Sequence, residues 1–524
     1  MMNHIFTIIV KNNNAEQYKY IVAVEGLFMY KNNTSVYESV KCFVNEFVKK
    51  NNDFNECYGA FRISIKREDK KQEIYFADNS GMMRFYINTN NNKVFGSLLE
   101  AVPTEKRRPN YPAIAQFISY GCIYGNETID ETIVLSDPNC FYQCNEDNIV
   151  EKTKQLEPLS KPHNSDMSLQ SLVSKAVMHC PDKIGCTITG GVDSRTVLAN
   201  LVSIGVKPEL AITGNELQSD VKIAKIIADK LKLNLSIISD DIDEDDWLEN
   251  TISAADGQAG ICSIYRLDKL ARFLNNKEII LQFGGLAGEM YKNSFINQDF
   301  PFYFGRPRWK RFYKYKVGTF DIDRSLFAKE TMQEIDRLPS TITKWLENHK
   351  GQTKSEAYLN AGYEIMQARC HQIINMFENH ATIYNPLMER RMAQYAFGKN
   401  PYLLDMQAFQ RHEVSSRCDT IKSVETDRGL TCDYKRRKTE FIKSNLFLIK
   451  VALNRMAFRK KIDIRIDRCF ETGHKGQDFI KALAVTQKMG ILCNDIDFET
   501  IPSGIADRLF TLGLFFLNSE YKIR

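Results

Sequence analysis

Apolar residues follow two different patterns along the chain. In the first 150 residues, short runs rich in β-branched and aromatic side chains, at 4–10, 20–30, 59–67 and 72–79, are separated by Asn, Asp and Lys clusters. Such runs are typical of β-strands. Residues 109–123 follow a helical pattern with a proline near its start. Together these patterns predict a strand-rich N-terminal domain.

From about residue 168 the pattern changes to strands that alternate with amphipathic helices. Strands are predicted over 184–191, 207–214, 235–241 and 278–285. Helices are predicted before and between them, over 168–180, 193–205 and 220–232. This alternation predicts a doubly wound parallel sheet. After about residue 350 the chain is predicted to be mostly helical.

A polar stretch with two prolines, at about 150–168, separates the two patterns and predicts a linker. With 524 residues, 43% hydrophobic and 26% charged, the chain has the composition of a globular protein and not of a disordered or fibrous one. The length fits about three domains, but two large ones fit as well. We expect an α+β domain over 1–155, followed by an α/β domain with a helical C-terminal part over 165–524.

The charge and the cysteine content limit the expected partners and the cellular compartment of the protein. A balance of 70 basic against 65 acidic residues leaves a net charge of +5, too small to indicate a nucleic-acid partner. The thirteen cysteines lack zinc spacing and the spacing of a disulfide framework, which favours buried free thiols in a reducing compartment. The start lacks the features of a signal peptide, and the longest apolar run, 509–517, is about half of a membrane span. We therefore expect a cytoplasmic protein.

The most informative stretch is a glycine turn between a strand and a helix, formed by Thr189, Gly190, Gly191, Val192, Asp193, Ser194 and Arg195. Its two glycines let the backbone approach an anion closely, and the helix N-terminus presents free N–H groups to that anion. Thr189 and Ser194 add hydroxyl groups, and Asp193 adds a carboxylate for Mg²⁺. The Gly-Lys-Ser/Thr ending of a Walker loop is absent. The alternative is an ordinary Gly-Gly turn in which Asp193 caps the helix.

This turn resembles the S-G-G-x-D-S pyrophosphate loop of the N-type ATP pyrophosphatases and, among them, that of the asparagine synthetase family. Thr189 keeps the hydroxyl group of the first Ser. The resemblance implies further nucleotide contacts in the next strand and helix and in the loop over 283–289, at Ala211, Ile212, Thr213, Gly214, Asp220, Gly284 and Gly285. It also implies ATP and Mg²⁺ as cofactors, with Asp193 and Glu289 as metal ligands. Residues 384–388 fall near the family's R-x-P-F-L-D segment.

The resemblance extends to the first 150 residues. Residues 75–86 resemble a strand pair of the family's glutamine amidotransferase domain, and 95–101 resemble the segment after it. This implies an Ntn-type αββα sandwich. The glutaminases of the family use an N-terminal cysteine, whereas positions 1–4 here read Met-Met-Asn-His, so we expect no glutaminase activity. The β-lactam synthetase and lasso peptide cyclase branches show the same loss.

Two more positions depart from the family pattern. Gly288 stands where the magnesium-binding Asp is expected, and only Glu289 keeps a carboxylate there. The late catalytic lysine, which stabilises charge at the adenylate, has no clear match. Lys422 is the candidate, with Lys435, Arg411 and Arg428 as alternatives, and each of these also fits a solvated surface charge.

Other charged stretches have a structural and a functional interpretation. Residues 435–468 carry 12 Lys or Arg against 3 Asp or Glu, interleaved with apolar residues. They predict either an anionic partner or a core-packed helix with a basic solvent face. The acidic run 240–246 is interpreted as a solvated turn, and Asp256 as a weak substrate-side candidate.

These observations predict an ATP-dependent ligase. It would adenylate a carboxylate on a peptide or small molecule with release of pyrophosphate, and an amine or ammonia would then attack to form an amide. Peptide or natural-product modification is the expected setting, with amidation of a sugar carboxylate in surface-polysaccharide synthesis as the alternative. A non-catalytic binding partner with the same fold also fits the pattern, as does an enzyme that adenylates its substrate without forming an amide.

Overall fold

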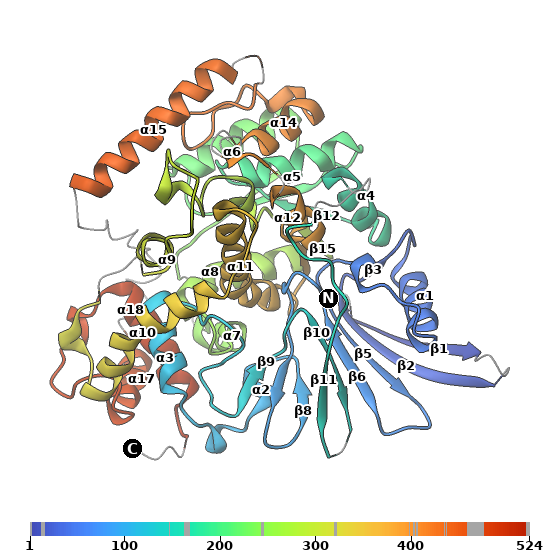
Figure 1. The fold of residues 1–524 in the computed structure, drawn as a ribbon, viewed down its shortest axis with the longest axis vertical. Helices are drawn as coiled ribbons and strands as arrows, with labels where there is room; N and C mark the ends of the chain where they lie inside the picture. Colours follow the sequence, from blue (N-terminus) through green and yellow to red (C-terminus); the bar gives the residue numbers. More distant parts are fainter. Residues whose placement is uncertain are drawn as a thin grey trace.

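The computed structural model describes residues 3–11, 16–145, 147–161, 168–242, 246–318, 322–397, 399–401, 404, 407–433, 435, 437–457 and 476–519. Its two main sheets differ in kind, as Figure 1 shows. An antiparallel sheet is built from the N-terminal part of the chain, and a parallel sheet with helices on both faces follows it. The α/β and α+β character predicted from the sequence is therefore confirmed in these general terms.

Six strands in the order β1-β2-β5-β6-β10-β11 form the antiparallel sheet. They are β1 Asn3–Lys11, β2 Gln17–Gly26, β5 Phe61–Arg67, β6 Glu73–Ala77, β10 Cys140–Cys144 and β11 Ile149–Thr153. Helix α1 (Val36–Val48) packs on it, because Phe43 inserts among the buried rings of Phe28 and Phe76. The side chain of Ser35 caps α1 by accepting a hydrogen bond from the Glu38 N–H.

Smaller elements complete the N-terminal part. A three-stranded antiparallel sheet has the order β8-β7-β9, and two short strands pair as β3-β4. The bounds are β3 Met29–Tyr30, β4 Cys57–Tyr58, β7 Tyr86–Asn88, β8 Lys93–Phe95, β9 Ile133–Leu135, α2 Leu98–Ala101 and α3 Tyr111–Tyr120. These sheets do not by themselves establish the Ntn-type sandwich that the resemblance implies, which stays a prediction.

Five parallel strands in the order β14-β13-β12-β15-β16 form the second sheet. They are β12 Ile184–Thr187, β13 Glu209–Thr213, β14 Leu235–Ile238, β15 Leu281–Phe283 and β16 Thr382–Tyr384. From β12 the chain adds β13 and then β14 on one side, and it then returns to add β15 and β16 on the other side of β12. The order of the strands therefore reverses at the place in the sheet where β12 and β15 are neighbours. Ligands of open α/β sheets bind at such a switch point.

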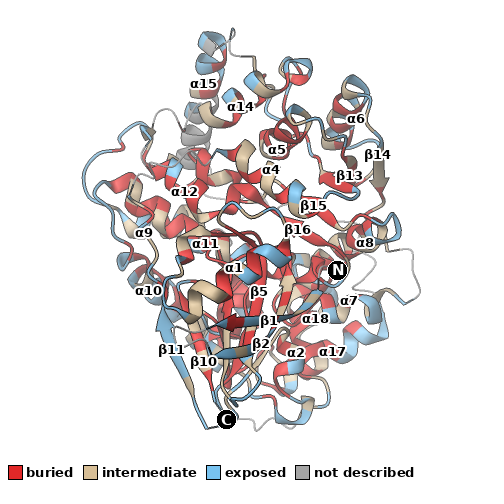
Figure 2. Cartoon of the chain, turned by 90° about the vertical axis from the view of Figure 1, so that its right-hand side faces the viewer, coloured by how far each residue is buried: buried red, intermediate tan, exposed pale blue. Residues whose placement is uncertain are grey.

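Helices cover both faces of the parallel sheet. Helices α5 and α6 lie on one face, and α8 and α11 lie on the other (Figures 1 and 2). The helices of this part are α4 Leu169–His179, α5 Val192–Ser203, α6 Ser219–Leu231, α7 Trp247–Ala255, α8 Ile261–Asn276, α9 Trp309–Phe312, α10 Lys329–Glu347, α11 Lys354–Phe377, α12 Arg390–Phe397, α14 Ala408–Arg417, α15 Arg437–Ala457, α17 Gln477–Lys488 and α18 Ser503–Phe515. The predicted strands over 184–285 and helices over 168–232 are confirmed as elements.

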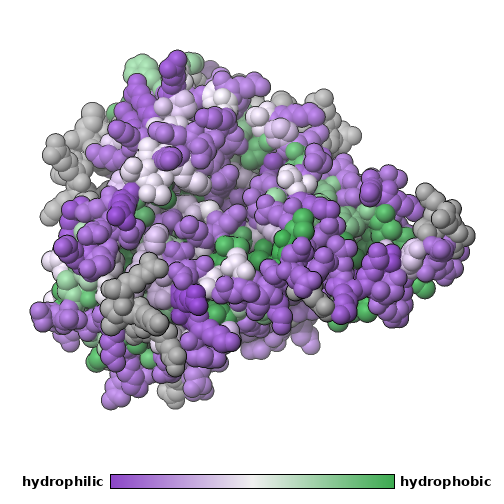
Figure 3. All heavy atoms as spheres, turned by 60° about the horizontal axis from the view of Figure 1, so that its bottom comes forward, coloured by the Kyte–Doolittle hydropathy of each residue, from purple (hydrophilic) through white to green (hydrophobic). Residues whose placement is uncertain are grey.

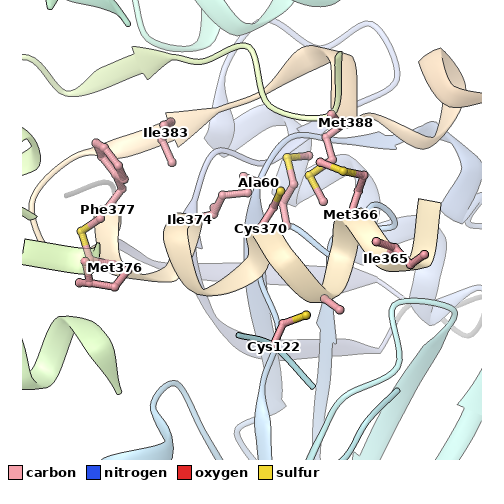
Figure 4. Close-up of a cluster of buried hydrophobic side chains, with 14 of the residues drawn as sticks. Ala60, Cys122, Ile365, Met366, Cys370, Ile374, Met376, Phe377, Ile383 and Met388 are labelled. Carbon is pink, nitrogen blue, oxygen red and sulfur yellow. The ribbon is translucent and has the colours of Figure 1, made fainter. Parts of the chain in front are cut away.

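One apolar core joins the smaller N-terminal elements to the parallel sheet, while the six-stranded sheet and α1 enclose a second core. Figure 4 shows α11 at the centre of the first core, where Cys370 and Ile374 pack beside Ala60 from the N-terminal part. Ile383 and Met388 approach the same helix from the parallel-sheet side. Figure 2 shows buried residues in both the antiparallel and the parallel part. The first residues of the predicted linker, 150–153, belong to β11, and 162–167 lie outside the described residues. The core packing joins the parts on either side of this stretch.

The state of the cysteines and the polarity of the surface agree with what the composition predicts. Every cysteine in the described part of the chain is a free thiol, and all of these except Cys42 and Cys493 are buried, as predicted. The face seen in Figure 3 is mostly hydrophilic with separate apolar patches. Among the described helices, none has the length and apolar character needed to span a bilayer.

A buried carboxyl group, that of Glu389, ties the N-terminal part to the region after β16. It accepts hydrogen bonds from the Gly59 N–H at 2.6 Å and from the Tyr384 hydroxyl at 3.0 Å, and Ser80 lies 3.4 Å away. Burial raises the pKa of Glu389 from 4.5 to about 8. The folded protein therefore holds a proton here that the unfolded chain releases above pH 4.5.

This proton makes folding stability depend on pH. The contribution is complete below pH 4.5 and is lost as the pH rises towards 8, by about 1.4 kcal/mol per pH unit for one such carboxyl. We expect Glu389→Gln to flatten the fall of the free energy of unfolding between pH 5 and pH 8, measured by denaturant unfolding. Glu249→Gln, at an exposed position in α7, is the matched control and should leave the slope unchanged. An equal slope in the Glu389→Gln protein would contradict this account.

Candidate nucleotide site

A cavity of about 430 Å³ opens at the carboxyl ends of the parallel strands. Every strand of the sheet contributes to its wall, through Thr187 of β12, Thr213 of β13, Asp240 after β14, Gly284 after β15 and Asn385 after β16. This is the location that the order of the strands favours for a ligand. The cavity therefore lies where the sequence predicted a nucleotide.

The glycine turn forms one end of the cavity. The Ser194 hydroxyl accepts a hydrogen bond from the Thr189 N–H at 3.0 Å and lies 3.1 Å from the Thr189 hydroxyl. Helix α5 begins directly after Gly191, and no side chain caps its first N–H groups. The N-terminal end of a twelve-residue helix therefore stands at the cavity, an arrangement that favours a bound anion.

Two glycines of the site are required by close packing. A Cβ atom at Gly285 would lie 2.6 Å from the backbone nitrogen of Ser194, so only glycine lets this loop touch the first turn of α5. A Cβ atom at Gly288 would lie 2.1 Å from the Asp193 carboxyl carbon. The position at which the resemblance led us to expect an aspartate is therefore closed to any side chain in this arrangement.

Asp193 is the electrostatic centre of the turn. One of its carboxylate oxygens lies 2.5 Å from the Lys292 ammonium, and the other accepts a hydrogen bond from the Gln410 amide at 3.1 Å. Gln410 also donates to the Gly288 carbonyl at 2.9 Å. Burial raises the pKa of Asp193, while the Lys292 ammonium opposes that rise and Glu289 adds to it. The carboxylate is thus compensated by a lysine.

The residues present do not fit a resident metal ion. Both oxygens of Asp193 have protein partners, and Glu289 is the other carboxylate whose charge acts on it. Within the described ranges, no group of three or more His, Cys, Asp or Glu residues is arranged to hold a metal. Magnesium ligation by Asp193 and Glu289 stays a prediction.

Arg195 was predicted to bind the cofactor, but its side chain contacts backbone carbonyl groups instead. It is fully buried and donates to the backbone carbonyls of Val424 at 2.5 Å, Glu425 at 3.2 Å and Gly190 at 3.4 Å. The Asp427 N–H donates to the Gly190 carbonyl at 3.0 Å. Arg195 therefore fixes the segment around 424–427 against the glycine turn and does not line the cavity.

The other predicted residues divide into two groups. Those that line the cavity are Thr189, Asp193, Ser194, Ala211, Ile212, Thr213, Asp220, Gly284 and Gly285. Those that do not are Gly190, Gly191, Val192, Arg195, Gly214 and Glu289. Lys422 also lies outside the lining, where its ammonium pairs with Asp419. Arg411, which the sequence offered in its place, donates to the Thr431 carbonyl at 2.9 Å. The cavity thus gathers most of the predicted site residues but only three of the seven in the glycine turn, and the late lysine stays unplaced.

The structure corrects two interpretations of acidic residues. The sequence predicts a solvated turn at Asp240, but this residue is buried, lines the cavity and lies 3.3 Å from the Gln218 amide. It lies two residues after the end of β14, and a position at the carboxyl end of a parallel strand is the signal that could have found it. The sequence also places Asp256 on the substrate side, but it ends α7 and accepts hydrogen bonds from the Leu98 and Leu99 N–H groups at 2.8 Å.

Sequence reasoning also missed the partners of Asp193 and the apolar wall of the cavity. Lys292 and Gln410 come from separate segments, and no motif marked either of them. The wall opposite the glycine turn is formed by helices α8 and α11 and by β16, through Leu267, Leu270, Ile373, Phe377 and Ile383. A cavity with an apolar wall at one end and a helix N-terminus at the other suits a ligand with a flat apolar part and an anionic part.

Comparison with protein-family models and with curated proteins identifies no relative of this chain. No family model matches the chain, and no curated protein matches it. The class that the fold and the site define is an α/β protein with a candidate nucleotide cavity at the switch point of a parallel sheet.

Proposed function

We propose that the protein is an ATP-dependent carbon–nitrogen ligase that adenylates a carboxylate and releases pyrophosphate. The observation that carries the proposal is the glycine turn at the switch point, where the uncapped start of α5 faces a cavity with an apolar wall. The adenine ring would lie against the wall formed by Leu270 and Phe377, and the phosphates would lie at the turn. The resemblance to the asparagine synthetase family supplies the reaction type.

Each group at the turn has a chemical task in this reaction. Pyrophosphate leaves with increasing negative charge, which the N–H groups of α5 and the Lys292 ammonium would stabilise. The Thr189 and Ser194 hydroxyl groups would donate to phosphate oxygens. Magnesium, brought with ATP, neutralises phosphate charge, and Asp193 would orient Lys292 at 2.5 Å. An amine or ammonia then attacks the acyl-adenylate to give an amide and AMP.

The nature of the products tests this reaction. We expect AMP and pyrophosphate, not ADP and phosphate, when the protein is incubated with magnesium–ATP and a panel of amino acids, peptides and sugar acids. Hydroxylamine should trap the acyl-adenylate as a hydroxamate, which identifies the carboxylate before its natural amine is known. The acid that gives a hydroxamate also separates peptide modification from amidation of a sugar carboxylate. ADP as the nucleotide product would overturn the proposal.

A nucleotide-binding partner without catalysis is the second candidate. The ion pair of Asp193 with Lys292 favours it, because the pair takes the carboxylate away from any metal. This candidate predicts ATP binding by calorimetry, with neither AMP nor hydroxamate formed from any acid of the panel. AMP that stays attached to an acceptor, with no hydroxamate or amide, would instead indicate nucleotide transfer.

A further inference from the structure

One surface segment combines aromatic and basic residues to an unusual degree. Between Phe302 and Lys316 the chain carries no Asp or Glu. Its basic residues are Arg306, Arg308, Lys310, Arg311, Lys314 and Lys316, and its aromatic residues are Phe302, Tyr303, Phe304, Trp309, Phe312, Tyr313 and Tyr315. We name this stretch the aromatic–basic segment. It contains α9 and lies outside the nucleotide cavity.

Two phenylalanine rings of the segment project into water. Phe302 is 73% exposed and Phe304 is 76% exposed, whereas Tyr303 between them is buried. Since apolar side chains of this size gain free energy on leaving water, two neighbouring exposed rings indicate a surface that contacts something apolar.

The backbone that carries these rings is held firmly. The Lys354 ammonium donates to the Phe302 carbonyl at 2.9 Å and pairs with Asp299 at 2.8 Å. The Tyr358 hydroxyl accepts a hydrogen bond from the Arg308 N–H at 2.7 Å. Because these anchors are buried side chains, the exposure of the two rings is a feature of the folded chain and not of a loose loop.

Positively charged residues follow the two rings closely in the sequence. Arg306, Arg308 and Lys310 follow the rings within six residues, and all three are exposed. The nearest acidic residue before the segment, Asp299, is buried and already pairs with Lys354 and with Arg311 at 3.5 Å. The surface beside the rings is therefore basic, and a partner that suits it offers an apolar interior beneath an anionic face.

We propose that the aromatic–basic segment docks the protein on a bilayer that contains anionic phospholipids. Phe302 and Phe304 insert among the acyl chains near the headgroups, and the Arg and Lys side chains around them contact the phosphates. The long cationic side chains keep their charged ends at the interface while their stems lie along apolar surface. This inference does not depend on the proposed ligase reaction.

A second element on the same side of the molecule also exposes both apolar and basic side chains. Helix α15, in the basic segment 435–468, exposes Phe441 (45%), Ile442 (58%), Leu446 (59%) and Ile449 (45%). Exposed lysines 438, 443 and 450 lie on the same helix. These four apolar side chains are not packed in a core, so the core-packed interpretation is wrong for them, while residues 458–468 lie outside the described residues. Figure 1 shows α9 and α15 on the left, away from β1.

A bilayer accounts for these features better than a nucleic acid does. Single strands are bound by rings that lie flat along a basic groove, so that successive bases stack on them. Here the residue between the two exposed rings is buried and the turn after them is open, since nothing lies within 4 Å of a Cβ built at Gly305. Protruding rings suit insertion into an apolar layer.

Vesicle co-sedimentation tests the proposal with the full chain. We expect binding to vesicles of phosphatidylcholine with about 30% phosphatidylglycerol, and much weaker binding to phosphatidylcholine alone. Phe302→Ser/Phe304→Ser should weaken binding about tenfold or more, because the inserted apolar area is lost. Arg306→Glu/Lys310→Glu should weaken it to a similar degree and reduce its dependence on salt.

The matched control is Ile5→Ser/Ile9→Ser, which removes two exposed apolar side chains, 79% and 60% exposed, from β1 on the opposite side of the molecule. It should bind vesicles as the wild type does. All of these positions are exposed, so the melting temperatures should stay together. Equal binding by the Phe302→Ser/Phe304→Ser protein would overturn the proposal. Binding to polyuridylate or heparin without binding to vesicles would overturn it as well, in favour of a soluble polyanion.

Discussion

Asparagine in place of Asp193 should slow pyrophosphate release from ATP by about 10²–10³-fold, the usual loss when one preorganised electrostatic contact is removed from an active site. Asp193 lines the candidate cavity, and its carboxylate lies 2.5 Å from the Lys292 ammonium. Asparagine has the same size and an oxygen that accepts a hydrogen bond from lysine, but it carries no charge. The measurement is the rate of pyrophosphate release at saturating ATP and carboxylate.

The structure supplies a control for stability. Removing one charge of a mostly buried ion pair leaves the other uncompensated, so Asp193→Asn should also lower the melting temperature. The double variant Asp193→Asn/Lys292→Met removes both charges and should recover part of this loss without recovering the rate. Ser194→Ala, which removes one hydroxyl, should be milder. If Asp193 only capped α5, asparagine would replace it with little loss, so a full rate in a folded Asp193→Asn protein would contradict the assignment.

The fold could be predicted where the local pattern decides the structure. Strands β12 to β15 and helices α4 to α6 alternate in the sequence as they do in space, because each element carries its own apolar face. The short strand β16 was missed, since three residues inside a helical region give no period of their own. The helix α1 was missed too, and the run 20–30 divides into β2 and β3 at Gly26, where φ is +78°.

The candidate site could be predicted as far as the glycine turn and no further. Thr189, Asp193 and Ser194 are neighbours in sequence, and the turn itself brings them together. Lys292 and Gln410 reach Asp193 from 99 and 217 residues away, Gln410 from helix α14, through tertiary packing that no local pattern encodes. The same packing removes Arg195 from the cavity, although the motif alone placed it there.

Methionine in place of Lys292 should weaken ATP binding about 10- to 100-fold when magnesium is removed with a chelator, the range expected for a lost charge-assisted hydrogen bond. Lys292 supplies a cation beside the turn, because its ammonium lies 2.5 Å from an Asp193 oxygen. A Cβ atom at Gly288 would lie 2.1 Å from the Asp193 carboxyl carbon, so this position offers no second carboxylate for a metal. The wild-type protein should therefore retain ATP binding without magnesium, as measured by titration calorimetry.

Magnesium should partly hide the defect, because the ion that enters with ATP neutralises the same phosphates. Lys292→Arg keeps the positive charge and should bind ATP more tightly than Lys292→Met does. The guanidinium group of the arginine is larger than the lysine ammonium and should disturb the 2.5 Å contact with Asp193. Lys481→Met, at an exposed ion pair in α17, is the matched control and should bind as the wild type does. The wild-type and Lys292→Met proteins could instead bind ATP only when magnesium is present, and with the same affinity. That result would mean that a metal ion, and not Lys292, neutralises the phosphates at the turn. If neither binds ATP under any condition, the nucleotide assignment itself fails.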